Sequence, residues 1–186
     1  LRAVYGTSAE KALMFHRQNQ DIFNSPCALA IERYTGVVYE HISWSTLSEK
    51  ARDYMEKYIY IFSGLFGLLT PKTPIPDYKL KMNVLSLQHH WNPILTETLK
   101  NEKVIIDLLP QVHRKAYNPN KKNVIQVDFL ILNKGKKSAA GHFGKAVKGE
   151  FIRYIAENNV TKIDDFSGFE YEGFKWDGIS FVKKGN

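Results

Sequence analysis

Few residues of this 186-residue sequence have the types and spacing that catalysis or metal binding requires. His89 and His90 are adjacent, so they point in different directions on a helix or strand and make a poor pair of metal ligands. The one cysteine, Cys27, follows Pro26 with no neighbouring residue that would activate a thiol, and we expect it to be idle. The chain contains neither a P-loop nor a GxGxxG fingerprint. The sequence therefore predicts no metal, no cofactor and no catalytic residue.

Positive charge is the stronger chemical signal, because it is concentrated in one stretch of the chain. Residues 111–150 hold nine Lys or Arg and two acidic residues, which accounts for the whole formal net charge of +7. A basic block attracts phosphate-bearing partners at long range, although lysines also serve on any surface to keep a protein in solution. On charge alone, a binding surface and an ordinary solvated surface are equally good interpretations.

The elements predicted around this block place several of its cations on a surface. A helix is expected over 145–158, with an apolar stripe along one side. Lys145 and Arg153 point away from that stripe, and Lys148 lies at its edge. A basic turn at 134–137 precedes this helix. Together the turn and the helix could follow the phosphate backbone of a nucleic acid.

The remaining pattern predicts a mixture of helices and strands. Ser8 is expected to cap a helix that runs through Ala9–Leu13. Further helices are expected over 45–57 and 92–99, and strands over 29–32, 36–41, 58–62, 104–109, 124–132 and, as a terminal hairpin, 169–181.

The segment between Ser63 and Met82 is the other candidate site, because its glycines and prolines impose a defined loop shape. Loops on a rigid scaffold are where binding and catalytic residues gather. This segment could form the pocket wall of an enzyme that acts on a nucleic-acid or nucleotide-like substrate, although no nucleophile or acid–base pair can be named. The residues that define its motif are Ser63, Gly64, Gly67, Pro71, Pro76 and Tyr78.

Composition limits the class of protein. The length suits one domain over residues 1–186, and 44% hydrophobic residues predict a packed interior. A single cysteine suits a reducing cytoplasm. The longest apolar run is far shorter than the roughly 20 residues of a membrane helix, so no membrane association is expected. The sequence begins with Leu1 rather than methionine, which suggests that an upstream part is missing.

Several phrases of the sequence follow one another in a recognisable order. The phrases are Tyr34–Tyr39, Ile61–Pro71, Ile75–Met82, Trp91, Lys145–Gly149 and Arg153–Asn158, continued by Phe166 and Tyr171. In order and spacing they resemble the YaaA family of peroxide-stress proteins over most of the chain, and the Ser-Gly-Leu-aromatic-Gly phrase before Pro71 is the most specific.

The resemblance implies a fold and a function. The fold would be α+β, a central mixed sheet flanked by helices, with a positively charged cleft and a helix-hairpin-helix element. That element would fall at or before Thr7–Gln18, where Gly6 is the only candidate for its hairpin glycine. The protein would be cytoplasmic, induced by hydrogen peroxide, able to bind DNA and associated with limiting free iron and hence oxidative DNA damage. About a quarter of the family's length would lie upstream of Leu1.

Two departures from the family pattern favour DNA contact over acid–base chemistry. Where the family has Asn-Leu-Ala-Ser-x-Glu-Tyr, residues 107–113 lack the polar Ser and Glu. Lys148 and Lys81 stand where the family has an arginine and an acidic residue, which keeps or raises the positive charge. The cations expected to contact DNA phosphates are Lys145, Lys148, Arg153, Lys136 and Lys137, with Lys79 and Lys81 as second choices.

Overall fold

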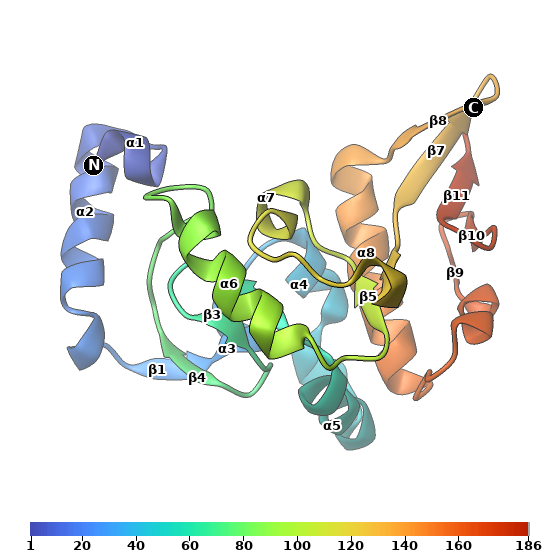
Figure 1. Cartoon of the computed structure of the whole chain (residues 1–186), viewed down its shortest axis with the longest axis horizontal. Coiled ribbons are helices and arrows are strands. Elements are labelled where there is room, and N and C mark those ends of the chain that lie inside the picture. Colours follow the sequence, from blue (N-terminus) through green and yellow to red (C-terminus); the bar gives the residue numbers. More distant parts are fainter. Residues whose placement is uncertain (186) are drawn as a thin grey trace. The chain divides into compact units, whose positions relative to one another are not determined.

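The computed structural model describes residues 1–185 and divides them into two compact units, each assembled from separate stretches of the chain (Figure 1). Unit 1 comprises Leu1–Arg33, Tyr60–Ile105 and Leu109–Ile125. Unit 2 comprises Tyr34–Ile59, Ile106–Leu108 and residues 126–185. Helices and strands are mixed in both units, which confirms the α+β class.

Unit 1 is mainly helical, with two small antiparallel sheets. Strand β1 (Cys27–Leu29) pairs with β4 (Pro74–Pro76), and β2 (Ile61–Ser63) pairs with β3 (Gly67–Leu69). Its helices are α1 (Arg2–Tyr5), α2 (Ala9–Gln20), η1 (Ile22–Asn24), α3 (Ala30–Arg33), α6 (Leu87–Leu99), α7 (Gln111–Arg114) and η3 (Lys121–Asn123).

The core of unit 1 forms around the buried face of α6. Leu95 and Leu99, one turn apart on this helix, pack with Met82, Ala116 and Tyr117. Partly buried hydrophobic residues close the cluster, among them Phe62, Leu68, Trp91 and Ile105. The two segments that flank α6 in sequence therefore share one core with it.

Unit 2 is built on a five-stranded mixed sheet. The strand order is β8-β7-β11-β10-β9, and only the β7–β11 pair is parallel. The strands are β7 (Phe129–Asn133), β8 (Lys136–Ala139), β9 (Glu170–Tyr171), β10 (Phe174–Trp176) and β11 (Phe181–Lys184). Its helices are α4 (Val37–Ile42), η2 (Trp44–Thr46), α5 (Glu49–Tyr58), α8 (Gly141–Glu157) and η4 (Ile163–Gly168). The antiparallel β10–β11 pair is the C-terminal hairpin that the sequence predicted.

Helix α8 covers one face of this sheet with the apolar stripe that its periodicity predicted. Val147, Phe151 and Ile155 recur every four residues and are buried. The ring of Phe151 lies 4.8 Å from that of Phe181 and 6.2 Å from that of Phe129, measured between centroids. Aromatic packing therefore joins the helix to the two parallel strands.

Strands β5 (Ile105–Asp107) and β6 (Val124–Gln126) form a further two-stranded sheet. The single strand expected over 124–132 is thus two strands, interrupted at Val127, whose N–H bonds to the carbonyl of Asp107. The strand expected over 104–109 is only three residues long.

The two strands predicted at 29–32 and 36–41 are wrong, because the chain there forms the helices α3 and α4 after a short β1. Val37, Val38 and Tyr39 favour strands locally, but α4 packs against α8, and a β-carbon at Gly149 would lie only 2.4 Å from the carbonyl oxygen of Val38. Close packing with α8 therefore overrides the local preference.

Helix boundaries also shifted from the sequence-based expectation. The cap at Ser8 is confirmed, since its hydroxyl accepts a hydrogen bond of 3.4 Å from the N–H of Lys11. The helix expected from Ser45 begins at Glu49 with Ser48 as its cap. Helix α6 begins at Leu87, which places Pro93 inside it rather than at its start. None of the helices within residues 1–185 is both long enough and apolar enough to cross a bilayer.

Candidate nucleic-acid interface

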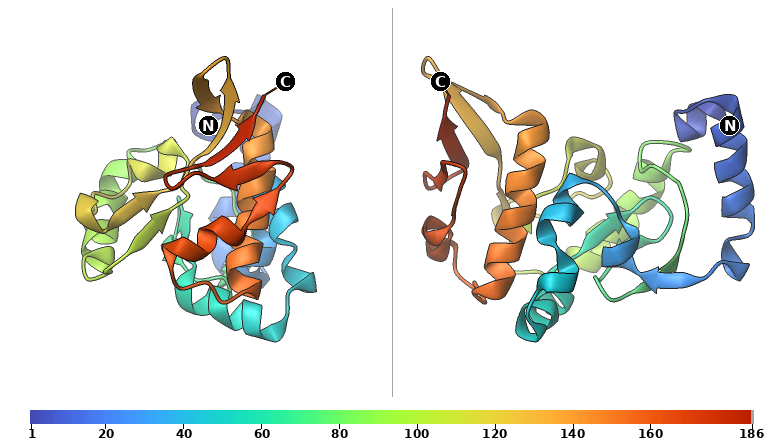
Figure 2. Two further views of the ribbon diagram at one scale, coloured as in Figure 1. Left: turned by 90° about the vertical axis from the view of Figure 1, so that its right-hand side faces the viewer. Right: turned by 180° about the vertical axis from the view of Figure 1, so that it is seen from behind.

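The hairpin of β7 and β8 carries exposed positive charge in unit 2. Asn133 pairs with Lys136, and the two residues between them, Lys134 and Gly135, have φ angles of 46° and 77°. Positive φ at both central residues defines a type I′ turn, which suits the twist of a hairpin. Every residue of β8 is exposed, as are the turn residues. This tip extends past the N-terminal end of α8 in both views of Figure 2.

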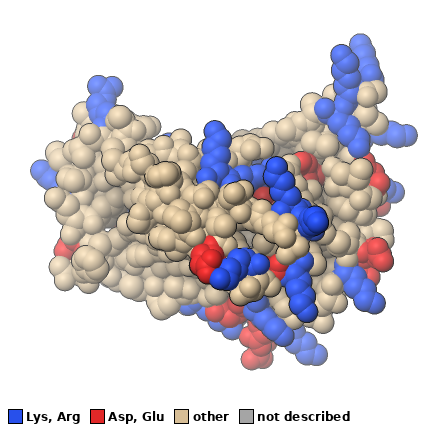
Figure 3. Space-filling view, in the orientation of Figure 1, with Lys and Arg blue, Asp and Glu red and all other residues tan. Residues whose placement is uncertain are grey.

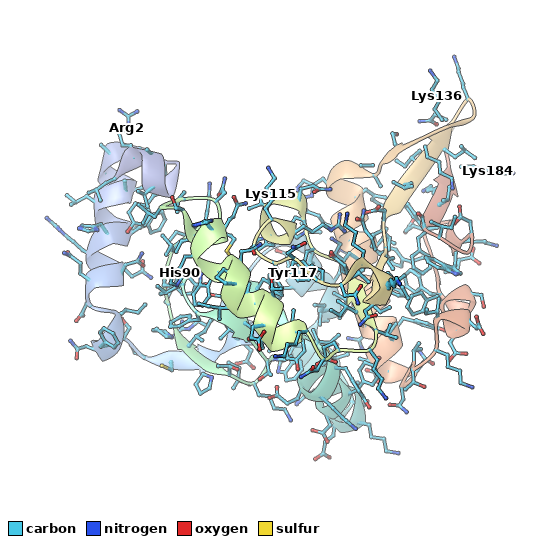
Figure 4. All side chains as sticks on the ribbon, in the orientation of Figure 1. Arg2, His90, Lys115, Tyr117, Lys136 and Lys184 are labelled. Atoms are coloured by element: carbon cyan, nitrogen blue, oxygen red, sulfur yellow. The ribbon has the colours of Figure 1, made fainter. Side chains whose placement is uncertain are left out.

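Three lysines at this tip hold their ammonium groups in solvent. Lys134 and Lys136 belong to the turn and to β8, and Lys184 ends β11, where it pairs with Leu132 of β7. All three are exposed, and none of their ammonium groups has a hydrogen-bond or ion-pair partner among residues 1–185. We name Asn133–Lys136 with Lys184 the basic tip. Lys and Arg side chains project where the tip lies in Figure 3, and Figure 4 labels Lys136 and Lys184 there.

The basic tip also has neutral hydrogen-bonding groups beside its cations. Asn133, Lys134, Lys136, Ser138 and Gly185 line a shallow depression on the surface. No acidic residue occurs between Phe129 and Gly149. None of the five lining residues is acidic, and ammonium, amide and hydroxyl donors are groups that contact phosphate oxygens in protein–DNA complexes.

Lys137, the next residue of β8, has its charge offset within the fold. Its ammonium lies 2.5 Å from a carboxylate oxygen of Asp177, in the loop between β10 and β11. This hydrogen bond, helped by the N–H groups of Ser180 and Ile179, lowers the pKa of Asp177. Lys137 therefore joins two hairpins of the sheet.

The guanidinium of Arg153 is bonded to other residues of unit 2, which its sequence position did not predict. Its guanidinium donates to the carbonyl oxygen of Ile42 at 3.1 Å and to the hydroxyl of Thr46 at 2.8 Å, with a longer bond to the carbonyl of Ser43. It also lies 3.6 Å from Glu157, one turn along α8. Since Ile42 ends α4, the arginine satisfies carbonyl groups that a helix C-terminus leaves without partners.

The two other expected cations of α8 differ in their surroundings. The ammonium of Lys148 is partly buried and donates to the carbonyl oxygen of Leu108. Lys145 is exposed and has no hydrogen-bond or ion-pair partner in the part of the chain that the structure describes. Of the five cations expected in unit 2, Lys136 and Lys145 are thus the most available to a ligand.

Lys79 and Lys81 lie in unit 1, beside helices α1 and α2. The side chain of Asn19 accepts from the backbone N–H of Lys79 at 3.0 Å and donates to its carbonyl at 2.9 Å. The ammonium of Lys79 lies 5.9 Å from the ring centre of Phe15. Both lysines are exposed, and a β-carbon at Gly6 would lie 3.0 Å from the ammonium of Lys81.

Two helices meet near Gly6, where the resemblance implied a helix-hairpin-helix element, and the first of them, α1, has four residues. Gly6 adopts the left-handed conformation at the end of α1, and Ser8 caps α2 two residues later. The short α1 and the longer α2 are therefore joined by a tight turn at Gly6–Ser8.

The motif loop of unit 1 uses its distinctive residues for packing. Ser63 is 1% exposed, and its hydroxyl accepts from the N–H groups of Leu65 and Phe66 and lies 2.6 Å from the hydroxyl of Tyr78. A β-carbon at Gly64 would lie 2.8 Å from the carbonyl oxygen of Leu80. The glycine is thus explained by a close approach within the protein.

The prolines of this loop have similar structural positions. Pro71 is fully buried, and its carbonyl accepts from the N–H of Ile31. Pro76 lies in β4 opposite Cys27, which is exposed. Among residues 1–185, no group of three or more His, Cys, Asp or Glu residues is arranged to hold a metal ion. These observations give the enzyme interpretation of the loop no additional support.

Sequence reasoning missed Lys134 and Lys184 as members of the interface. Lys134 was recognised only as part of a basic turn. The pair Lys183-Lys184 is visible in the sequence, but only the parallel pairing of β11 with β7 brings Lys184 to this hairpin.

Comparison with known proteins identifies the family. The family model described as "Peroxide stress protein YaaA" matches residues 1–179. A UPF0246 protein of Lactobacillus helveticus is 29% identical over 157 residues, which are 77% of this chain and 62% of that protein. A UPF0246 protein of Phocaeicola vulgatus is 29% identical over 171 residues, which are 83% of this chain and 67% of that protein. The chain thus spans under two thirds of the first relative, and it belongs to the YaaA family of peroxide stress proteins.

Proposed function

We propose that this protein acts in the peroxide-stress response by binding DNA through phosphate contacts made by the basic tip and Lys145. The observation that carries the proposal is the set of exposed ammonium groups without partners at Lys134, Lys136, Lys184 and Lys145. Unpaired lysines release counterions when they meet phosphates, and this release drives DNA binding that is independent of sequence.

The family assignment supplies the physiological setting of the proposal. A protein bound along DNA would act where peroxide and free iron cause damage, which fits the proposed role in limiting oxidative DNA damage. A cytoplasmic location is proposed with it, because the one cysteine suits a reducing compartment. Base-specific contacts are not part of the proposal, since α8 presents no row of Arg, Asn and Gln side chains.

The test is to measure the affinity of the 186-residue chain for a short duplex across a salt series. We expect the logarithm of the binding constant to fall linearly with the logarithm of salt concentration, with a slope of about −0.9 for each phosphate contacted. Absence of binding at low salt, or binding that does not change with salt, would contradict the proposal.

Paired charge-reversal variants locate the surface. Lys136→Glu with Lys184→Glu should weaken binding by at least about a hundredfold, because two contacts are lost and two repulsions are gained. Lys121→Glu with Lys122→Glu changes the net charge equally at exposed residues of η3 whose ammonium groups likewise have no partner within residues 1–185. Equal weakening by both pairs would show that only net charge matters and that the surface is placed incorrectly.

A further inference from the structure

The basic tip carries cations on both faces of the sheet. Side chains opposite each other on neighbouring strands point to the same face, and successive side chains along a strand alternate between faces. Lys136 pairs with Asn133, whereas Lys137 and Lys184 pair with Leu132 from its two sides. Lys136 therefore points to one face and Lys184 to the other. Lys134 is the first of the two central residues of the turn.

The tip is also narrow. Among the described residues, the last pair of β11 with β7 joins Lys184 to Leu132, and Gly185 lies beside Asn133, its N–H bonded to the carbonyl of Leu132. The turn residues Lys134 and Gly135 extend beyond this pairing. Two strands lie about 4.8 Å apart, and with side chains on both faces such a ribbon is about 10 Å thick. Two residues at about 3.4 Å each carry the turn about 7 Å beyond Lys184.

These dimensions fit one groove of DNA and not the other. The major groove is about 12 Å wide and about 8.5 Å deep and admits a two-stranded ribbon, whereas the minor groove is only about 6 Å wide. The phosphates of the two DNA strands line the opposite walls of the groove. A ribbon with Lys136 on one face and Lys184 on the other presents a cation to each wall.

The turn of the basic tip has the same backbone shape as another turn of the sheet and differs from it in charge. The sheet contains a second two-residue turn between β9 and β10, where Glu172 and Gly173 have φ angles of 52° and 81°. Both turns place a residue other than glycine in the left-handed region, which has a cost in conformational energy. One turn presents a carboxylate and the other an ammonium at the same position, so only the 133–136 turn suits an anionic partner.

We infer that the basic tip inserts into the major groove of duplex DNA, with Lys134 leading and Lys136 and Lys184 contacting the phosphates of the two walls. The inference rests on the proposed DNA binding and specifies its geometry. Asn133 and Ser138 share the face of Lys136 and therefore lie toward the same wall of the groove in this arrangement.

A modified duplex tests the groove directly. Glucosylated 5-hydroxymethylcytosine places a sugar in the major groove and leaves the number of phosphates unchanged. We expect the wild-type chain to bind a duplex rich in this base at least tenfold more weakly than the same sequence with cytosine. Distamycin, which fills the minor groove of A·T-rich duplexes, should leave the affinity unchanged.

A single neutral substitution tests the leading residue. Lys134→Asn removes the ammonium and keeps a residue that tolerates a left-handed turn, so the hairpin should fold as before. It should weaken duplex binding about eightfold at about 0.1 M salt, the contribution of one phosphate contact. Lys121→Asn makes the same charge change in η3 and should have a much smaller effect; circular dichroism confirms that both variants are folded.

These experiments distinguish failure of DNA binding from failure of insertion into the major groove. Failure of the wild-type chain to bind any duplex overturns the proposed function and this inference with it. Salt-dependent binding that is equally strong on glucosylated and ordinary duplex overturns the inference and leaves DNA binding intact. Loss of affinity in the presence of distamycin, with tolerance of the glucosylated duplex, assigns the tip to the minor groove and also overturns it.

Discussion

The indole ring of Trp91 fills the space that a side chain at Gly67 would need. A β-carbon at position 67 would lie 2.5 Å from the ring atom Cζ3 of Trp91. The same indole donates a hydrogen bond of 2.9 Å to the carbonyl oxygen of Gly64, which holds the ring in place. The spacing of the two glycines in the family phrase thus follows from how one tryptophan packs against the β2–β3 turn.

Replacing Gly67 with alanine should destabilise the protein by about 2–4 kcal/mol, because the methyl group meets a fixed ring and the φ angle of 74° is unfavourable for alanine. Unfolding in urea, followed by tryptophan fluorescence, measures the loss.

Gly135→Ala provides the matched control for this prediction. Its φ angle is 77°, but nothing lies within 4 Å of the added β-carbon. It should cost only about 1 kcal/mol, from backbone strain alone. If the two variants lost equal stability, the clash with Trp91 would have no energetic role.

Arg153 should prove to be a stability residue rather than a DNA contact. Arg153→Lys removes the planar fork that reaches Ile42 and Thr46, and one ammonium cannot replace it. We expect a loss of about 1–3 kcal/mol in the free energy of unfolding. Thermal unfolding measures it, and DNA affinity at a temperature where the variant is folded should match the wild type.

Lys145→Ala on the same helix should behave in the opposite way. The residue is exposed and has no partner within residues 1–185, so stability should change by no more than about 0.5 kcal/mol while DNA binding weakens. A stable Arg153→Lys protein that no longer bound DNA would contradict this division of roles.

His113 should make the protein less stable as the pH falls. Its ring atom Nδ1 is buried without a hydrogen-bond partner in the described chain, and burial lowers its pKa below the ordinary value of 6.5. As the pH falls, His113 therefore takes up a proton in the unfolded chain at a higher pH than in the folded protein. Since the unfolded state then binds more protons, the free energy of unfolding rises with pH through this range and falls on acidification below about 6.5.

Urea unfolding of His113→Leu between about pH 7.5 and 5.5 checks this sign. The variant should show a shallower decline with acidification than the wild type, whatever its stability at neutral pH. His142→Leu, which makes the same substitution at an exposed histidine of α8, is the matched control. An unchanged slope in His113→Leu would show that another group controls the acid response.

Local sequence patterns correctly predicted those helices whose residue spacing and capping residues match their packing in the fold. The four-residue spacing of Val147, Phe151 and Ile155 specified α8, and Ser8 marked the start of α2. The strand predicted in place of α4 was wrong because valine and tyrosine favour strands locally. The helix forms because α4 packs closely against α8 at Gly149, and this contact joins two segments that are far apart in the sequence. No local signal could report it.

The sequence predicted where positive charge is concentrated in the candidate site, but it did not predict which of the cations have partners within the protein. The sequence placed Lys136 and Lys137 in one basic turn, but one ammonium is in solvent and the other pairs with Asp177, 40 residues away. Similarly, Arg153 faces away from the apolar stripe, as expected, yet its partners lie at the end of α4. Distinguishing these roles requires the contacts between segments.

The position of β11 in its sheet has a consequence for how the chain is made. This strand is formed by residues 181–184 and lies in the middle of the order β8-β7-β11-β10-β9. During synthesis, the strands on both sides of it leave the ribosome first and have no common neighbour to join them. The sheet of unit 2, and the two-sided arrangement of Lys136 and Lys184, can therefore be completed only after nearly all of the sequence described here has been translated.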